Sequence, residues 1–451
     1  MTPGERRAAA ALASIYALRM LGLFMILPVF ALYAERLEGV TPVAVGLAIS
    51  AYGLTQALLQ IPFGLASDRF GRKPVIVFGL LLFALGSVIA ALADDVTTVI
   101  LGRALQGSGA IAAAVLALAA DLTRESVRTR MMASIGASIG VAFALALVLG
   151  PLLDRWIGVP GIFLLTAGLA LAGMAVVTFA VPTPTVNLPS GDGPLSGRFA
   201  PVLRDPELLR LDAGILVLHA ILTATFVVFP LMLRDAAGFD AARHWQVYLP
   251  VLLLSLAGMV PLVIYAERHR KHRPVFLAAI VLLAVGQLGL YGAGGSFAGL
   301  VMALVVMFTA FNLLEASLPS LVSKTVHGER KGAAMGVYSS AQFLGAFLGG
   351  LGGGLVHGAF GPGAVFLFCA GLAVVWLLLA APMRPPRELA SRMLMVGELT
   401  PVQARELARR IGAVSGVVEA VVVAEEGVAY LRVEEARLDE AALREFSTTS
   451  A

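Results

Sequence analysis

Four ionisable side chains lie within long apolar runs of this chain: Arg19, Arg103, His219 and Glu315. A charged group in a membrane helix costs at least about 2.5–3.5 kcal/mol on insertion scales, so it normally faces a cavity or a polar partner. Arg19 and Glu315 have opposite charges and come from opposite halves of the chain. We therefore expect these two side chains to pair across a cavity in some conformations of the protein.

Glu315 is the candidate proton carrier. A low-dielectric environment favours the protonated form of a carboxyl group, and a nearby arginine favours the ionised form. A carboxyl group that alternately meets and loses Arg19 would therefore take up and release a proton, whereas a permanent ion pair would be only structural. Pro319 cannot donate a hydrogen bond to the Glu315 carbonyl, and Asn312 is also near, so this helix is expected to be locally irregular.

His219 titrates near neutral pH in its unperturbed state and is a candidate proton relay. A histidine that only hydrogen-bonds a neighbouring helix is an equal alternative. Arg103 also has two interpretations, because an arginine near the membrane interface can extend its charge to water or can act in proton transfer.

The composition indicates a membrane protein. Of the 451 residues, 59% are hydrophobic and 14% are charged, whereas soluble domains have about 25% charged residues. Most of the chain must therefore face the lipid bilayer. The single cysteine, Cys369, excludes an intrachain disulfide and a cysteine-based metal site. The formal net charge of +4 is too small to indicate nucleic-acid binding. No catalytic triad, phosphate-binding glycine loop or metal cluster is visible, so we expect no enzyme activity, cofactor or metal.

Apolar runs of about 20 residues predict an α-helical membrane protein with twelve transmembrane helices. The predicted spans are 10–33, 43–64, 74–93, 97–120, 130–152, 160–181, 209–232, 245–265, 274–293, 297–322, 333–357 and 362–383.

Cations are concentrated in alternate loops, which sets the predicted orientation. The cation-rich loops contain Arg69, Arg72, Lys73, Arg124, Arg128, Arg130, Arg268, Arg270, Lys271, Arg273, Lys324, Arg330 and Lys331. The positive-inside rule places these loops and both termini in the cytoplasm. We expect a multi-pass protein of the cell inner (cytoplasmic) membrane.

The two halves repeat each other. Lys73-Pro74-Val75 and Arg273-Pro274-Val275 open equivalent spans, and Gly86 and Gly286 keep the same spacing. Such duplication is typical of secondary transporters, whose binding site lies between the halves. The predicted domains are a six-helix bundle at 1–181, a cytoplasmic linker at 182–208 and a second six-helix bundle at 209–384.

Residues 385–451 have a different pattern, which predicts a small cytoplasmic α+β domain. Met393–Val396 is a predicted strand, and Thr400 with Gln403 forms a capping box for a helix to about Val414. Val417–Val423 and Val428–Val433 are β-branched runs around Glu425-Glu426-Gly427, which indicates a hairpin. Asp439 precedes a last helix, Glu440–Phe446. This β-α-β-β-α order is close to a ferredoxin-like module with its final strand missing or truncated.

The loop between the second and third spans reads GLASDRFGRK, from Gly64 to Lys73. This pattern resembles the loop between helices 2 and 3 of major facilitator superfamily carriers, although Ala66 stands where leucine is usual. The resemblance implies that Arg72 contacts Asp121 at the end of helix 4 and that Asp68 caps helix 11. These contacts would form a conformational latch, with Gly64 allowing close helix packing and Gly71 the tight turn. Arg69 and Lys73 complete the motif.

The same resemblance places helices 1, 4, 7 and 10 around a central cavity. Arg103 with Gln106 and Gly107 is similar to the family's helix-4 motif, whose arginine is linked to proton transfer. Gly150-Pro151 matches the antiporter motif of drug exporters only in part. With the ferredoxin-like tail, the chain looks most like the drug/proton antiporter-like carriers of the YajR group.

The expected function is proton-coupled efflux (antiport) of small amphipathic compounds by alternating access. One alternative is a proton-coupled symporter or facilitator of a sugar or metabolite. Another is a membrane sensor that signals through its C-terminal domain. The expected partners are a small-molecule substrate, protons and lipid, with a possible cytoplasmic ligand or protein for the tail, and we expect a monomer.

Overall fold

The computed structural model describes residues 1–123, 125–182, 195–326, 330–383, 390–397, 399–424 and 426–447. The chain divides into two compact units. The membrane unit comprises Met1–Val322 and Gly332–Met383, and the C-terminal unit comprises Ser323–Lys331 and Arg384–Ala451.

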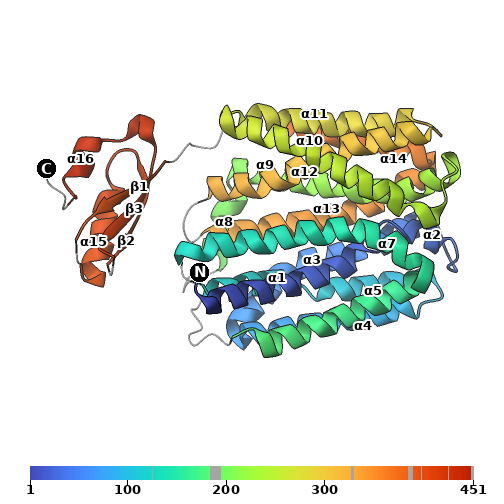
Figure 1. The fold of residues 1–451 in the computed structure, drawn as a ribbon, viewed down its shortest axis with the longest axis horizontal. Helices are drawn as coiled ribbons and strands as arrows, with labels where there is room; N and C mark the ends of the chain where they lie inside the picture. The colour runs from blue at the N-terminus through green and yellow to red at the C-terminus, as the bar shows by residue number, and fades with distance from the viewer. Residues whose placement is uncertain are drawn as a thin grey trace. The chain divides into compact units, whose positions relative to one another are not determined.

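The first half of the membrane unit is helical, and its long helices lie side by side (Figure 1). They are α1 (Pro3–Phe24), α2 (Phe30–Ala34), α3 (Pro42–Phe70), α4 (Arg72–Ala91), α5 (Val96–Ser108), α6 (Ala112–Asp121) and α7 (Glu125–Ala175), which ends in the π-helical turn η1 (Val176–Ala180).

The second half follows a short helix, α8 (Leu195–Leu203), which lies within the expected linker 182–208. Residues 183–194 of that linker are outside the described residues. The helices of this half are α9 (Pro206–Leu231) with the π-helical turn η2 (Met232–Ala236), the 3₁₀ turn η3 (Ala241–Arg243), α10 (Trp245–Arg268), α11 (His272–Gly292), α12 (Phe297–Thr325), α13 (Arg330–Phe360) and α14 (Pro362–Ala380).

Eleven helices of the described residues are long and apolar enough to cross a membrane, against twelve expected spans. The difference arises because Arg130–Ala180 is one continuous candidate that contains two of them. Gly158 interrupts this segment with non-helical angles (φ 66°, ψ 173°), a conformation that glycine adopts at little cost. The helical architecture of two six-helix repeats is therefore confirmed.

Two of the expected spans contain a break in the helix. Span 10–33 is broken between α1 and α2, where Pro28 lacks a backbone N–H. Span 97–120 is broken between α5 and α6, where Gly109 leaves the helical region (φ −77°, ψ 57°). Glycine is a poor helix former, so this break follows from the Gly-Ser-Gly sequence that ends at Gly109.

Equivalent glycines pack equivalent helices in the two halves. A Cβ atom at Gly86 of α4 would lie 2.5 Å from the Gln106 nitrogen of α5. One at Gly286 of α11 would lie 2.8 Å from the Met307 nitrogen of α12. Both contacts leave no space for a side chain, so the repeat seen in the sequence is also a repeat of packing.

The ends of the membrane unit differ in charge. We call the end that carries Arg72, Arg130 and Arg268, where α1, α9 and α13 begin, the basic face, and the other end the opposite face. Figure 1 shows α1, α8 and the N-terminus at one end of the unit and α2 at the other.

The halves touch near the opposite face, where α3 packs against α13. A Cβ atom at Gly46 would lie 2.1 Å from the Gly350 carbonyl oxygen, and one at Gly53 would lie 2.6 Å from the Phe343 carbonyl oxygen. The rings of Tyr52 and Phe343 are 6.3 Å apart. The backbones therefore approach as closely as small residues permit in membrane helices.

The C-terminal unit contains a three-stranded antiparallel sheet of order β1-β3-β2. Its elements are β1 (Ala390–Met395), α15 (Pro401–Gly412), β2 (Val417–Val423), β3 (Val428–Val433), the 3₁₀ turn η4 (Glu435–Arg437) and α16 (Glu440–Arg444). Its hydrophobic core contains Val396, Ile411, Ala429, Leu431, Val433 and Leu443.

The order of elements in this unit confirms the expected small α+β domain. Thr400 and Gln403 form the expected capping box, and both hairpin strands have the expected bounds. β1 begins three residues earlier than predicted, and the last helix ends at Arg444 rather than Phe446. Glu425 of the expected hairpin turn lies outside the described residues.

Candidate functional site

Arg19 is buried in the first half of the membrane unit, with 1% of its surface exposed. Its Nη2 donates to Gln56 Oε1 of α3 (2.5 Å) and to the carbonyl oxygen of Gly109 (3.0 Å). The guanidinium also lies 5.3 Å from the Phe83 ring centre. A broken membrane helix must have its freed backbone groups paired within the protein. Arg19 pairs with such a freed group, the Gly109 carbonyl oxygen, at the break between α5 and α6.

Arg103 is fully buried, so the interpretation as an arginine extending to water is wrong. Its guanidinium donates to the carbonyl oxygens of Ala48 (3.2 Å) and Ile49 (2.9 Å) on α3 and to Gln106 Oε1 (2.8 Å). It also lies 4.5 Å from the centre of the Tyr52 ring. This arginine links helices α3 and α5 inside the first half.

The other two residues of the helix-4 motif, Gln106 and Gly107, add contacts between the same helices and α4. Gln106 Nε2 donates to Ser87 Oγ of α4 (2.7 Å). A Cβ atom at Gly107 would lie 2.0 Å from the Tyr52 carbonyl oxygen, so only glycine allows α5 to approach α3 here. The motif therefore binds three helices of the first half together.

Glu315 belongs to a polar cluster in the second half. Its Oε1 accepts a hydrogen bond from Gln342 Nε2 of α13 (3.3 Å). The same amide nitrogen lies 2.9 Å from His219 Nε2 of α9, while His219 Nδ1 lies 3.3 Å from the Ile215 carbonyl oxygen. An amide donor at Nε2 and a carbonyl at Nδ1 fit a neutral imidazole protonated on Nδ1. His219 Nδ1 is 3.9 Å from Glu315 Oε2.

The Glu315 side chain is accessible within the membrane unit. It is 36% exposed, against 12% for His219, although α12 continues for ten more residues, about 15 Å of helix, to its end at Thr325. The exposure belongs to the side chain as a whole, because the Oε2 atom of the carboxyl group is buried. Asn312 bonds elsewhere, donating to Ser255 Oγ of α10 (3.0 Å).

The structure does not bring Arg19 and Glu315 together, so the pair expected in some conformations is not formed in this one. Arg19 is held by α3 and by the break in helix 4, whereas Glu315 faces α9 and α13. The sequence could not show this, because the position of the freed Gly109 carbonyl depends on where the fourth helix breaks.

The loop motif forms a compact ionic cluster at the basic face. Arg72 Nε donates to Asp121 Oδ2 (3.0 Å), and Nη1 donates to Ser67 Oγ (2.8 Å) and to the Asp68 carboxylate. Gly71 has φ 93°, in the left-handed region that disfavours other residues. The Arg72–Asp121 contact implied by the family resemblance is therefore present.

The other motif residues have separate contacts. Lys73 Nζ donates to the Val181 carbonyl oxygen at the end of η1, where a cation suits the helix C-terminus. The Arg69 guanidinium lies 5.5 Å from the Phe70 ring centre. A Cβ atom at Gly64 would lie 3.2 Å from the Ala113 Cβ. The expected cap of helix 11 by Asp68 stays a prediction; residues 327–329, just before α13, are outside the described residues.

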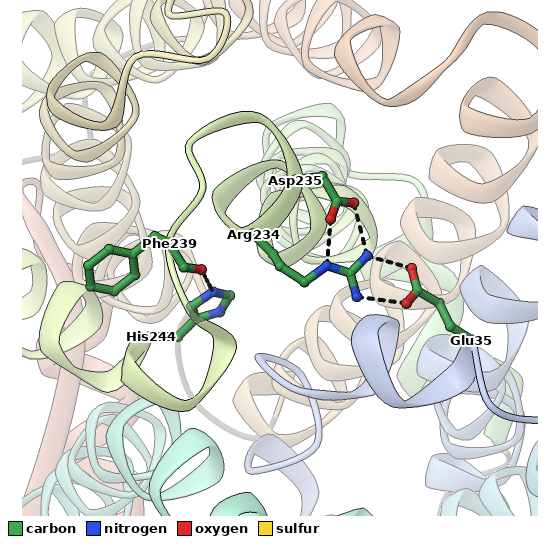
Figure 2. Close-up of polar contacts among 5 residues, drawn as sticks. All are labelled: Glu35, Arg234, Asp235, Phe239 and His244. Carbon is green, nitrogen blue, oxygen red and sulfur yellow. Dashed lines mark hydrogen bonds and ion pairs between the residues drawn. The ribbon is translucent and has the colours of Figure 1, made fainter.

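An ion pair that the sequence did not suggest joins the halves at the opposite face (Figure 2). Arg234 Nη1 and Nη2 donate to the two carboxylate oxygens of Glu35 at 2.6 and 2.7 Å, a two-bond geometry that is strong and directional. Asp235 accepts from Nε and Nη2 of the same guanidinium. Arg234 lies in η2, and such π-helical turns often occur at functional positions.

A neighbouring contact shapes the loop after η2. Figure 2 also shows His244, whose Nε2 lies 3.2 Å from the Phe239 carbonyl oxygen. This contact closes the turn that connects η2 to α10.

Two six-helix halves, with polar clusters inside each and an ion pair between them, define a membrane transporter of the secondary type. The chain belongs to the Major Facilitator Superfamily, whose family model matches residues 12–270 and 244–415. It is 47% identical to the inner membrane transport protein YajR of Escherichia coli K12 over 96% of this chain and 95% of that protein. Members of this family bind small-molecule substrates and are not enzymes.

A more distant relative agrees on the family, and a solved structure agrees on the fold. The multidrug resistance protein MdtH of Aeromonas hydrophila is 29% identical over 75% of this chain and 84% of its own length. The structure of a bacterial homologue of the human lysosomal transporter Spinster, in an inward-facing and occupied conformation, aligns with a TM-score of 0.70. That match has 13% identity and covers 85% of this chain and 98% of the Spinster homologue.

Proposed function

We propose that this protein is a proton-coupled exporter of small amphipathic compounds that works by alternating access. The observation that carries the proposal is the Glu315 carboxyl group, which lies within a membrane helix and contacts His219 and Gln342. A carboxyl group inside a membrane helix that has polar contacts on two other helices can bind a proton and respond to movement of those helices.

The coupling would depend on how the halves move. α9 and α13 supply the two contacts of Glu315, and both helices also take part in contacts between the halves at the opposite face: Arg234 follows α9, and Gly350 belongs to α13. Opening that face would therefore move the partners of Glu315 and change its preference for a proton.

The orientation follows from charge. We propose that the basic face is cytoplasmic, in agreement with the positive-inside rule and with the inner membrane location named for the YajR relative. The contacts between the halves near the opposite face fit a state that is closed toward the outside. The latch formed by Arg72, Asp68 and Asp121 would then act on the cytoplasmic side.

Export of amphipathic compounds is supported by the multidrug resistance relatives. The energy is sufficient, because one charge crossing 100 mV releases about 2.3 kcal/mol and a tenfold concentration gradient needs about 1.4 kcal/mol. Inward proton movement can therefore drive outward movement of such a compound.

The test is transport by the full-length protein in proteoliposomes with a pH-sensitive dye inside and an imposed proton gradient. Ethidium is the first of a panel of amphipathic cations. We expect ethidium and protons to move in opposite directions, and Glu315→Gln to abolish the proton-dependent part. Glu267→Gln removes an exposed carboxylate near the end of α10 and should have no effect.

Movement in the same direction would show symport instead. No proton-linked movement of any compound in the panel would favour the sensor alternative. Unchanged proton-linked transport by Glu315→Gln would exclude the role assigned to this residue.

A further inference from the structure

Helices α9 and α13 pack closely and run parallel. A Cβ atom at Gly345 would lie 2.1 Å from the Leu216 carbonyl oxygen, and one at Gly349 would lie 2.1 Å from the Ala220 carbonyl oxygen. Each contact follows the previous one by four residues on both helices. The pairing is therefore regular, and it continues one turn further on, where a Cβ atom at Gly353 would lie 3.0 Å from the Ala224 Cα. Because both helices are continuous, the same pairing can be extended by one turn toward the basic face.

One turn nearer the basic face, this pairing sets Asp212 level with Ala341. Ala341 lies between Tyr338 and Gln342 on α13, so the carboxyl group of Asp212 belongs to the same layer as these two polar side chains. Asp212 is 7% exposed and Tyr338 is 4% exposed. Gln342 donates to Glu315. A series of polar side chains, Gln342, Tyr338 and Asp212, therefore leads from Glu315 toward the basic face.

Three polar atoms along this line are buried and have no hydrogen-bond partner within the part of the chain that the structure describes. They are Asp212 Oδ2, the Tyr338 hydroxyl and Glu315 Oε2. Tyr338 lies one helical turn from Gln342 on α13, so both belong to the face of the helix that also meets Glu315. Buried polar atoms cost free energy unless water or a protein group pairs with them. An ordered path of water and protons would pair all three atoms.

The other charged groups at this end of α9 are already paired. Asp205 caps the helix by accepting from the Glu207 and Leu208 nitrogens, and Glu207 pairs with Arg210 at 2.6 Å. Among the described residues, no lysine or arginine forms an ion pair with Asp212. Asp205 thus fills the role of capping the start of the helix, and Asp212 lies seven residues, about two turns, further inside.

We propose that Asp212 is a second proton-binding carboxyl group, connected to Glu315 through the Tyr338 hydroxyl. The proposal rests on the proton coupling proposed above. In each transfer the Tyr338 oxygen accepts a proton from the Glu315 side while its own proton passes to the Asp212 carboxylate, through water where the groups do not touch. One proton moves, tyrosine stays neutral and no redox partner is needed. Asp212 then exchanges its proton with water at the basic face.

The first test counts carboxyl groups. Infrared spectra of the full-length protein in lipid, recorded over a range of pH, should show two protonated-carboxyl bands that titrate within the membrane unit. Asp212→Asn should remove one and Glu315→Gln the other. Asp212→Glu should shift its band rather than remove it, which keeps the test valid if the asparagine variant does not fold. Glu207→Gln is the matched control on the same helix and should change neither band.

The second test measures rate. In the ethidium proteoliposome assay, Tyr338→Phe should slow proton-linked transport on the order of a hundredfold, the low end for a positioned proton donor and acceptor. Both carboxyl bands should remain. Tyr248→Phe is the matched control, because Tyr248 is also fully buried with an unpaired hydroxyl among the described residues but packs against Phe226 and Phe229.

The outcomes separate this inference from the proposed function. If Glu315→Gln abolishes coupling while Asp212→Asn and Tyr338→Phe leave bands and rates unchanged, the relay is wrong and proton-coupled transport stands. If Glu315→Gln retains coupling, the role assigned to Glu315 fails, and if the unsubstituted protein shows no proton-linked transport, the proposed function fails. In both cases the presence or absence of an Asp212 band still decides whether Asp212 binds a proton.

Discussion

The Glu35 carboxylate and the Arg234 guanidinium form a two-bond ion pair that joins the halves of the membrane unit. Glu35 follows α2 and Arg234 lies in η2, so the contact closes the opposite face beside the packing of α3 on α13. A pair between the halves can exist only while that face is closed, and it therefore favours the closed state over the open one.

Removing this pair should shift the protein toward opening of the opposite face. The two side chains are 48% and 33% exposed, and exposed pairs contribute about 0–1 kcal/mol, so Glu35→Gln should change the closed-to-open ratio by at most about fivefold. Distances between spin labels placed across that face measure the ratio. The only native cysteine, Cys369, is buried and should not take up label.

Double substitution tests whether the effect belongs to the pair. Glu35→Gln and Arg234→Gln together should shift the ratio no more than either change alone, because both remove the same contact. Glu38→Gln, three residues away and without an ion pair among the described residues, should leave the ratio unchanged. Additive shifts would show that the two residues act separately.

Gly46→Ala should have a larger effect on the same equilibrium. The new Cβ atom would lie 2.1 Å from the Gly350 carbonyl oxygen and 3.2 Å from the Gly354 Cα, and backbone atoms cannot move aside as a flexible side chain can. The closed state should therefore become strained, and spin-label distances across the opposite face should lengthen. Gly168→Ala, where no atom lies within 4 Å, is the matched control. Equal spin-label distances in Gly46→Ala and Gly168→Ala would refute a role for the α3–α13 packing in closing the opposite face.

Arg19→Gln should destabilise the membrane unit without changing the protonation of Glu315. The substitution leaves the buried Gly109 carbonyl unpaired, which costs about 1–3 kcal/mol. A thiol-reactive fluorescent dye reports unfolding, because Cys369 is fully buried in the folded state and becomes reactive when the unit opens. Arg210→Gln removes a partly exposed cation of α9 and should hardly change the unfolding temperature.

The infrared band of Glu315 tests the other half of this prediction. Arg19 binds Gln56 and Gly109 and does not reach Glu315, so the band should titrate at the same pH in Arg19→Gln as in the unsubstituted protein. A shifted band would support the direct Arg19–Glu315 pair that the sequence suggested.

Local patterns in the sequence predicted most of the fold. Apolar runs gave the membrane helices, and β-branched runs gave the bounds of β2 and β3, because both signals depend on neighbours in the chain. The Arg72–Asp121 contact joins residues 49 positions apart, and it was expected only because the loop motif resembles that of a known family.

The partners of isolated charges depend on tertiary packing and were not predicted. Arg19 was assigned to Glu315 because the break at Gly109 was hidden in an apolar run. Arg234 was not singled out in the sequence, although its π-helical turn brings it into contact with Glu35 of the other half. Asp212 lies seven residues, about two turns, before His219, and this spacing was a signal that could have placed both residues on one face of α9.

The C-terminal unit should unfold independently of the membrane unit. Leu431 is 2% exposed in a core of its own, so Leu431→Ala should destabilise this unit by about 2–5 kcal/mol and make it sensitive to limited proteolysis. The temperature at which Cys369 becomes reactive should not change, because Cys369 packs against α9 of the membrane unit. Val421→Ala, at a position that is 37% exposed on β2, is the control and should leave proteolysis unaffected. If Cys369 became reactive at a lower temperature in Leu431→Ala, the two units would instead fold cooperatively. Ethidium transport by that variant would then be expected to fall as well.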